Sequence, residues 1–175
     1  MRTAAKRLTK AEMRTLIEEF AQALNDHDVE AVAARLAADV TWIHPFTVEP
    51  LRGREAVKAD LSETFRSFPD LHAPLEDTRI YIGDDHSTAV TSWTMLGTMS
   101  GPSPEGFEST GRFMRITGDS RYTFRGSLIS EYTMVYDGLE FARQLGMLPK
   151  EKSLTFKALL EMQRWTIKAR KALRI

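Results

Sequence analysis

The chain has 175 residues, of which 42% are hydrophobic, and its 24 basic side chains balance 24 acidic ones. This length suits one domain with a substantial apolar core, and the composition argues against disorder. The lack of cysteine excludes disulfide scaffolds, thiolate metal sites and cysteine nucleophiles. No apolar run is long enough to span a membrane, and the basic N-terminus is not followed by the apolar segment of a signal peptide. We therefore expect a cytoplasmic protein.

The overall neutrality conceals an uneven distribution of charge along the sequence. Residues 150–175 contain eight Lys or Arg and two Asp or Glu, a net charge of +6, so residues 1–149 carry −6. A basic end of this kind can bind nucleic acid or an anionic membrane. Because the rest of the chain is acidic, we favour pairing of this tail with the body of the protein or with a partner subunit. We expect no nucleic-acid or membrane partner.

Helices are predicted in the first part of the sequence. Thr9-Lys10-Ala11-Glu12 has the form of a capping box, and apolar residues recur at helical spacing after it. Asp28 can cap a short second helix. Residues 40–44 are predicted to form a strand, and Gly53 precedes a third helix that ends at Pro69. The apolar stripe of this third helix consists of Val57, Leu61, Phe65 and Phe68.

After Pro74 the apolar period changes from helical spacing to alternation, which predicts strands. Gly118 is expected to mark a bulge or a bend. The expected strands cover residues 75–82, 87–99, 109–124 and 128–136.

Two helices are predicted after the last strand. The first covers residues 138–145 and stops at Gly146. The second covers residues 153–173, and its apolar stripe is too wide to face water, so we expect it to pack on something. Helices followed by consecutive hairpins describe an α+β domain. We assign residues 1–149 to this domain and residues 150–175 to a basic amphipathic helical tail.

Five short motifs follow one another between His44 and Pro149. They are Phe68-Pro69-Asp70-Leu71, the strand end Gly97-Thr98-Met99-Ser100-Gly101, Thr110-Gly111-Arg112, Thr117-Gly118-Asp119, and residues 129–149 with Arg143-Gln144-Leu145-Gly146. In this order they resemble the SnoaL-like polyketide cyclases, a branch of the nuclear transport factor 2-like superfamily. The tail lies outside the resemblance.

The resemblance implies a conical barrel of curved antiparallel sheet whose N-terminal helices enclose a pocket, in a homodimer. The family includes polyketide ring cyclases, and its relatives include ketosteroid isomerases and epoxide hydrolases. Such enzymes use a few polar groups at the wall of a mostly apolar cavity. The resemblance therefore implies a small hydrophobic molecule as partner, with no metal and no other cofactor. The fold alone does not decide among these reactions.

A cyclase or isomerase of this type needs a base in an apolar pocket and a donor that stabilises the enolate. His44 is the base that we favour, because an imidazole titrates near neutral pH. A hydrogen-bonded structural histidine is the alternative. Tyr132 is a candidate donor. Asp137 is a further catalytic candidate, although Asp137-Gly138-Leu139-Glu140 has the form of a helix N-cap, which we favour.

Several polar groups that the resemblance would place on the strands are absent here. Met134 and Met99 stand where relatives carry an aspartate and a histidine, and the Arg-X-Asp pair of the epoxide hydrolases falls near Trp93 and Met95. What remains is aromatic and sulfur-containing, which suits a flat hydrophobic ligand, although the same residues could simply fill the core. The expected pocket residues are Trp42, Phe46, Trp93, Met95, Met99 and Met134. No metal-binding spacing, P-loop or dinucleotide fingerprint is present.

Three functions are compatible with these observations. The first is a cyclase or an isomerase-type lyase that acts on a polyketide-like or steroid-like carbonyl compound by cofactor-independent proton transfer. The second is a non-catalytic module of the same fold that binds a hydrophobic ligand. The third is an interaction protein whose sheet and tail mediate assembly. An acid within hydrogen-bond range of His44 would favour the enzyme, whereas a filled cavity would favour the third function.

Overall fold

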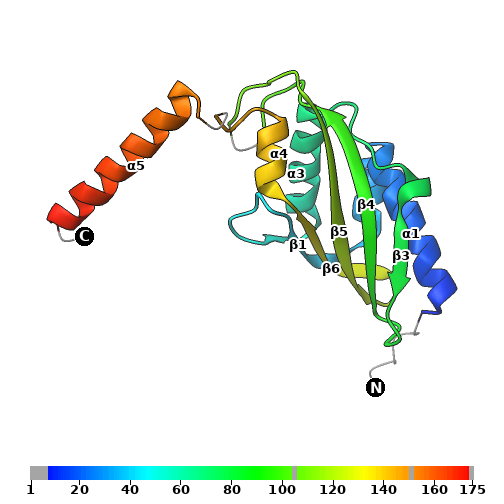
Figure 1. Ribbon diagram of the computed structural model, residues 1–175. Coiled ribbons are helices and arrows are strands. Elements are labelled where there is room, and N and C mark those ends of the chain that lie inside the picture. The colour runs from blue at the N-terminus through cyan, green and yellow to red at the C-terminus, as the bar shows by residue number, and fades with distance from the viewer. Residues whose placement is uncertain (1–7, 104–105, 150–151, 174–175) are drawn as a thin grey trace.

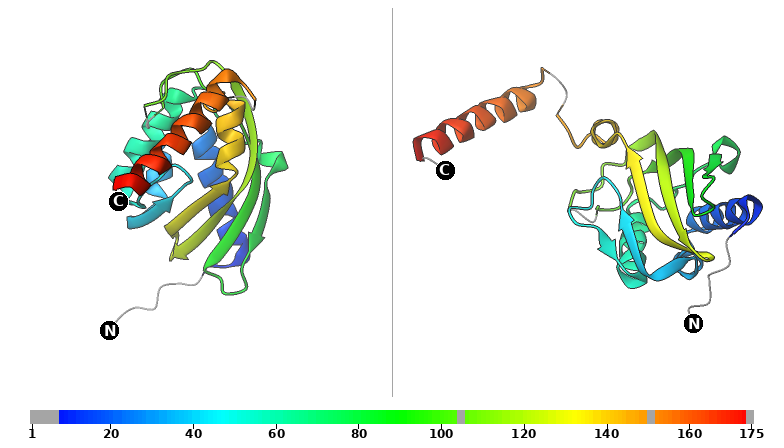
Figure 2. Two further views of the ribbon diagram at one scale, coloured as in Figure 1. Left: turned by 60° about the vertical axis from the view of Figure 1, so that its left-hand side comes forward. Right: turned by 90° about the horizontal axis from the view of Figure 1, so that it is seen from below.

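The computed structural model describes residues 8–103, 106–149 and 152–173, and it has the expected α+β architecture. One curved sheet bends around α1 (Lys10–Asn25) and α3 (Arg54–Ser67), which lie on its concave face (Figures 1 and 2). The short α2 (Val29–Ala34) connects α1 to β1. None of the described helices is long and apolar enough to cross a membrane.

The sheet has six strands in the order β2-β1-β6-β5-β4-β3. It curves without closing, and it is mixed instead of purely antiparallel, because β1 runs parallel to β6 while the other neighbours are antiparallel. The first strand pairs with the last one, so the start of the domain is joined to its end. The strands are β1 (Leu36–Ile43), β2 (Leu51–Arg52), β3 (Arg79–Ile82), β4 (Thr88–Thr98), β5 (Phe113–Arg125) and β6 (Leu128–Tyr136).

Local hydrogen bonds begin the helices where the sequence predicts. The Thr9 side chain accepts a hydrogen bond from the N–H of Glu12, whose carboxylate accepts one from the Thr9 N–H, which confirms the capping box. The Asp28 carboxylate accepts a hydrogen bond from the N–H of Ala31 and so caps α2. Asp137 accepts hydrogen bonds from the N–H groups of Leu139 and Glu140 and so caps α4 (Gly138–Gln144).

Two of the sequence motifs meet in space. The Asp70 carboxylate accepts hydrogen bonds from the N–H of Thr98 at 2.6 Å and from its hydroxyl at 2.7 Å. Burial of the Asp70 carboxyl raises its pKa, but the hydrogen bonds from Thr98 outweigh this effect and hold the pKa below its usual value. The turn after α3 is thereby attached to the end of β4.

Three expectations about the strands are corrected, and one further strand was not expected. Residues 75–77 form a short 3-10 helix, so β3 starts only at Arg79, because the chain turns directly after Pro74. β5 starts at Phe113, later than expected, and β2 was not foreseen. Gly118 lies in regular register opposite Trp93, and the irregularity falls between Thr123 and Phe124. Gly118 therefore does not mark a bulge. Its missing side chain lets the Trp93 ring lie close to β5.

The core lies between the helices and the concave face of the sheet, in two clusters. The larger cluster joins the inner face of α1 to the sheet and includes Met13, Ile17, Phe20, Trp42 and Tyr132. The smaller cluster lies towards α4 and includes Phe68, Trp93, Met99, Met114 and Leu145. Each cluster combines residues from distant parts of the chain.

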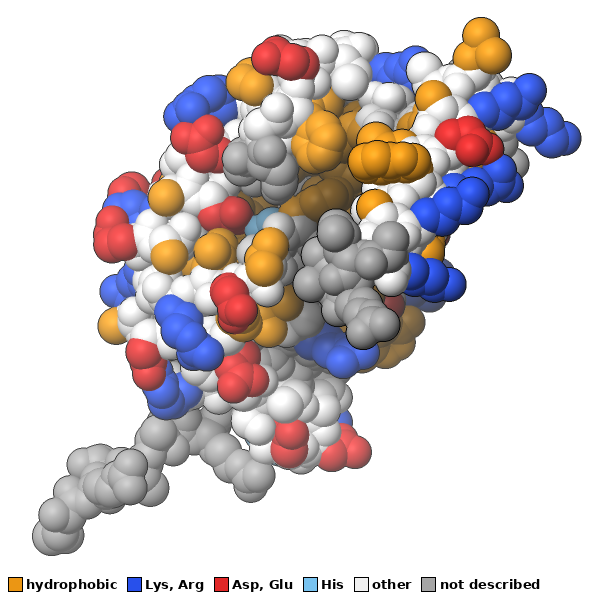
Figure 3. Space-filling model, turned by 90° about the vertical axis from the view of Figure 1, so that its left-hand side faces the viewer, with side chains coloured by type: hydrophobic (Ala, Val, Ile, Leu, Met, Phe, Trp, Pro, Cys, Tyr) orange, Lys and Arg blue, Asp and Glu red, His pale blue; other side chains and the backbone are white. Residues whose placement is uncertain are grey.

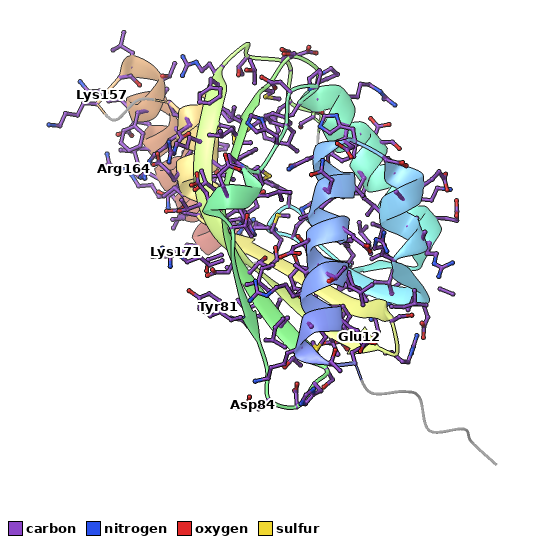
Figure 4. The ribbon with its side chains drawn as sticks, turned by 90° about the vertical axis from the view of Figure 1, so that its right-hand side faces the viewer. Glu12, Tyr81, Asp84, Lys157, Arg164 and Lys171 are labelled. Carbon is purple, nitrogen blue, oxygen red and sulfur yellow. The ribbon has the colours of Figure 1, made fainter. Side chains whose placement is uncertain are left out.

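The last helix, α5 (Leu154–Leu173), extends away from the rest of the chain (Figures 1 and 2). None of its described side chains is buried, and Trp165 is 72% exposed. The body of the same chain therefore does not provide the expected packing partner. Lys157, Arg164 and Lys171 lie along one side of α5 (Figure 4).

Gly118→Ala is expected to lower the free energy of unfolding by about 1–3 kcal/mol, as overpacking does in other cores. A Cβ at this position would lie 2.6 Å from the Trp93 ring and 2.5 Å from the Val135 carbonyl oxygen, so the indole or the strand must move. Urea unfolding measures the change. Gly126→Ala is a useful comparison, since nothing lies within 4 Å of its Cβ and its cost comes from the positive φ alone. An unchanged stability of Gly118→Ala would contradict the close approach.

Candidate functional site

A cavity of about 180 Å³ lies between the concave face of the sheet and the helices. Its walls come from α1, α3, β1, β4, β5, β6 and α4, and from the loop that contains Phe107. Figure 3 shows a hollow in the molecular surface with hydrophobic side chains along its walls. The expected residues that line the cavity are Trp42, His44, Phe46, Trp93, Met95, Tyr132 and Met134.

Two of the expected site residues lie elsewhere. Met99 is fully buried in the smaller core cluster, where Thr110 contacts its sulfur, and it is not part of the cavity wall. Asp137 is exposed at the start of α4, with its carboxylate occupied by two backbone N–H groups. Its geometry is that of a helix cap, as its sequence context favours.

The most polar feature of the cavity wall is a pair formed by His44 and Asp60. The Nε2 of His44 lies 3.2 Å from the Oδ1 of Asp60, and the side chains are only 16% and 18% exposed. The N–H of Phe46 donates a 3.4 Å hydrogen bond to the Nδ1 of His44. We therefore infer that the neutral ring carries its proton on Nε2 and donates it to Asp60. Nδ1 is then the basic atom.

Asp60 was not identified from the sequence, although a signal was present. It lies on the inner face of α3, one helical turn after Val57 and one turn before Thr64, and Thr64 also lines the cavity. An acidic residue within an otherwise apolar stripe is therefore the signal that could have identified it. Asp60 places an acid within hydrogen-bond range of His44.

The floor of the cavity carries a chain of buried hydrogen bonds across three strands. The indole N–H of Trp93 donates to the Ser120 hydroxyl at 2.9 Å, and this hydroxyl lies 2.8 Å from the Tyr132 hydroxyl. The hydroxyls of Thr91 and Tyr122 form a second contact at 3.3 Å. Ser120 and Tyr122, like Asp60, were missed in the sequence, because a strand pattern does not show which hydroxyls meet.

Burial of the two tyrosines keeps their hydroxyl groups protonated. It raises the pKa of Tyr122 to about 12 and that of Tyr132 well above its usual range, because a phenolate is poorly solvated there. Tyr132 can therefore donate or accept a hydrogen bond, but it is no base at neutral pH. Within the described part of the chain, no three acidic or histidine side chains are grouped as a metal site would require.

The chain matches the SnoaL-like domain family over residues 17–132, which is well over half of its length. The chain belongs to this family. The matched region contains β1, α3, β4, β5 and the first part of β6, and with them His44, Asp60 and the hydrogen-bonded chain. Among curated protein sequences, none matches.

Solved structures of several bacterial proteins have the same fold. A candidate polyketide cyclase from Xanthomonas campestris is 19% identical, with a TM-score of 0.71 over 78% of this chain and 98% of its own. TsrD from Streptomyces laurentii is 28% identical, with a TM-score of 0.65 over 81% and 99% of the two chains. AclR from Streptomyces galilaeus, described as a candidate hydroxylase, is 18% identical, with a TM-score of 0.67 over 93% and 98%.

The likeness to AclR extends beyond the domain. The alignment with AclR covers 93% of this chain, so it leaves out about 7%. Residues 150–175 make up about 15% of the chain, and the alignment must therefore include part of α5. The aligned part of the chain thus extends past Pro149.

The stability of the protein is expected to fall as the pH rises through the range from about 10 to 12. The unfolded chain releases the Tyr122 proton near pH 10, whereas the folded chain holds it until about pH 12, so alkaline pH favours unfolding. The contribution of Tyr122 is about 1.4 kcal/mol per pH unit within this window. Urea unfolding of the wild type and Tyr122→Phe at several alkaline pH values measures it.

The control for this experiment is Tyr81→Phe, because Tyr81 is more than half exposed. This variant should keep the pH dependence of the wild type, whereas Tyr122→Phe should have a flatter one. Equal pH dependence of all three proteins would contradict the raised pKa of Tyr122.

Proposed function

We propose that this protein is an enzyme that binds a hydrophobic carbonyl compound of polyketide-like or steroid-like skeleton and catalyses its cyclisation or isomerisation by cofactor-independent proton transfer. The observation that carries the proposal is the pair of His44 and Asp60 at the wall of a largely apolar cavity. The cavity volume of about 180 Å³ is below the usual range for pockets that bind drug-sized ligands. The enclosed part of the substrate is therefore a single ring or two fused rings.

The pair is suited to remove a proton from the carbon next to a carbonyl group. Nδ1 of His44 gives up its long hydrogen bond from the Phe46 N–H and takes the proton. The C–H electron pair forms the new C–C double bond, and the π electrons of the carbonyl move to its oxygen, which becomes the enolate oxygen. Asp60 accepts the Nε2 proton in a hydrogen bond and stabilises the imidazolium that forms. The enolate then regains the proton from His44 at another carbon. Alternatively its carbon attacks a second carbonyl within the substrate and closes a ring, and the alkoxide that forms takes the proton from the His44 imidazolium.

A non-catalytic ligand-binding module is the second candidate. Met95 and Met134 line the cavity at the places where the resemblance to the cyclases and epoxide hydrolases would put polar groups. Flexible, polarisable methionine side chains adapt to ligands of different shape. Binding without any proton exchange would support this candidate.

We also propose that the protein is a homodimer in which α5 packs on the body of a second copy. The apolar residues Leu154, Met162 and Trp165 are exposed on α5, and a helix of this kind is only marginally stable alone. The tail carries +6 and the rest of the chain −6, so the two attract each other.

Proton exchange in D2O tests the catalytic proposal. 1-Indanone, a ketone of two fused rings, exchanges its C2 protons through an enolate, and the wild type is expected to accelerate this exchange. His44→Ala should lower the rate by about 10²–10⁴-fold, since it removes the base. Asp60→Asn should lower it less, because the imidazole stays but loses its charged partner. Deuterium incorporation is followed by NMR, and melting temperatures show whether each variant is folded.

Asp137→Asn is the matched control for Asp60→Asn. It makes the same chemical change outside the cavity, and asparagine is as good an N-cap as aspartate, so both activity and stability should be retained. Loss of exchange in Asp137→Asn at unchanged stability would reverse the roles of the two acids. Binding of ketones by a wild type that exchanges none of them would favour the binding module.

Light scattering tests the dimer. The full chain is expected at twice its monomer mass of 19.9 kDa, whereas truncation after Pro149 should give a monomeric or insoluble protein. Trp165→Glu should weaken the dimer, while Gln163→Glu makes the same change in charge away from the apolar stripe and should not. A monomeric full chain, together with a truncated chain that is soluble and equally stable, would contradict this role of the tail.

A further inference from the structure

We propose that the hydroxyl group of Thr64 donates a hydrogen bond to the carbonyl oxygen of the ligand. The ligand is then oriented with this oxygen towards α3, and the cavity prefers ketones to hydrocarbons of the same shape. The chemical role of this hydroxyl rests on the proposed function, but the binding that it implies can be measured without turnover.

Thr64 lies in the middle of the face of α3 that borders the cavity. It is one helical turn after Asp60 and one turn before Phe68, and all three residues line the cavity. Leu61 and Phe65, its neighbours on the same face, line the cavity as well. Because the residues around Thr64 border the cavity on every side, its own side chain projects towards the same space.

The Thr64 hydroxyl differs from the other hydroxyls of α3 in its hydrogen bonding. Ser62 and Ser67 each donate to the backbone carbonyl four residues earlier, which is a common way to satisfy a hydroxyl within a helix. Among the described residues, the Thr64 hydroxyl has neither this bond nor any other. It is therefore directed away from its own helix backbone, and its donor is available to a ligand.

The Thr64 oxygen is also accessible. The residue is half-buried, and within the described part of the chain the only buried side-chain atoms without a partner are the Nε of Arg35 and the Nε1 of Trp42. The unpartnered oxygen of Thr64 therefore keeps accessible surface, unlike the N–H of Trp42. A threonine side chain also turns about a single bond between staggered positions, and its hydroxyl hydrogen rotates to suit its acceptor. A ligand oxygen within the cavity can thus be met by this hydroxyl.

The position of Thr64 suits the charge that develops in the proposed reaction. Asp60 holds His44, and the spacing of four residues puts the Cβ atoms of Asp60 and Thr64 about 5–6 Å apart. When His44 takes a proton from the carbon next to a carbonyl, negative charge moves to the neighbouring oxygen. A hydroxyl donor at that oxygen stabilises the enolate more than the ketone, which lowers the barrier. A hydrocarbon in the same place offers this donor no acceptor, so it binds less tightly.

Calorimetric titration with two matched compounds tests the assignment. 1-Indanone and indane have the same ring skeleton, but only 1-indanone has a carbonyl oxygen. The wild type is expected to bind 1-indanone about tenfold more tightly than indane, in proportion to one neutral hydrogen bond. Thr64→Val keeps the shape of the side chain without the hydroxyl and should remove this preference, whereas Thr64→Ser should keep it. Thr94→Val is the matched control, since Thr94 alternates on β4 with Trp93 and Met95 and is not among the described residues that line the cavity.

Infrared spectroscopy of 1-indanone labelled with carbon-13 at its carbonyl shows the hydrogen bond directly. A hydrogen bond to the oxygen lowers the carbonyl stretching frequency, so the frequency of the bound ketone should rise in Thr64→Val and stay at the wild-type value in Thr64→Ser and Thr94→Val. Proton exchange should fall by more than affinity in Thr64→Val, by about 10²–10³-fold, because the donor acts most strongly on the enolate. Thr64→Ala gives the same readouts if Thr64→Val does not fold.

Equal affinity of the wild type for the two compounds, no binding of either, or an unchanged carbonyl frequency in folded Thr64→Val would each overturn this role of Thr64. Exchange of the C2 protons at the wild-type rate in Thr64→Val would overturn it while leaving the catalytic proposal intact. A preference for 1-indanone that depends on Thr64, without any exchange in the wild type, would keep the donor and refute the catalytic proposal instead.

Discussion

The hydrogen-bonded chain from Trp93 through Ser120 to Tyr132 is the interaction on which the rest of this site depends. It crosses β4, β5 and β6 on their concave face, and the stacking of Tyr132 on Trp42 extends the contact to β1. Four strands are thus joined through side chains in addition to their backbone ladder. Because Gly118 has no side chain, the Trp93 ring can lie directly on β5.

This chain separates the groups that build the cavity from those that can act on a ligand. The hydroxyls of Ser120 and Tyr132 satisfy one another, which a buried polar group requires. His44 and Asp60 lie at the wall, where they are partly exposed. The hydrogen-bonded floor is therefore distinct from the His44–Asp60 pair, which lies at the wall of the cavity.

Membership of the SnoaL-like domain family establishes the fold but leaves the chemistry to individual residues. The strand positions where the resemblance would place an aspartate and a histidine hold methionine in this chain. The acid that accompanies His44 comes instead from α3, across the cavity from the sheet. The polar pair of this cavity is therefore built partly from a helix instead of from the strands alone.

The sequence by itself determined what depends on neighbouring residues. Thr9, Asp28 and Asp137 begin helices because each side chain bonds N–H groups two or three positions away, and β6 has the predicted bounds because its alternation is regular. The same alternation put Tyr132, Met134 and Tyr136 on one face of β6, and all three line the cavity. These features need no knowledge of distant segments.

Only the tertiary structure decided which distant residues meet. Asp60 is 16 residues from His44 and reaches it because α3 packs across β1, and Ser120 joins Trp93 and Tyr132 because β5 lies between their strands. The parallel pairing of β1 with β6 and the exposure of α5 are decided in the same way. Such contacts depend on how whole helices and strands pack. The hydrophobic effect is not directional, so one pattern of apolar residues is compatible with several arrangements of the same elements.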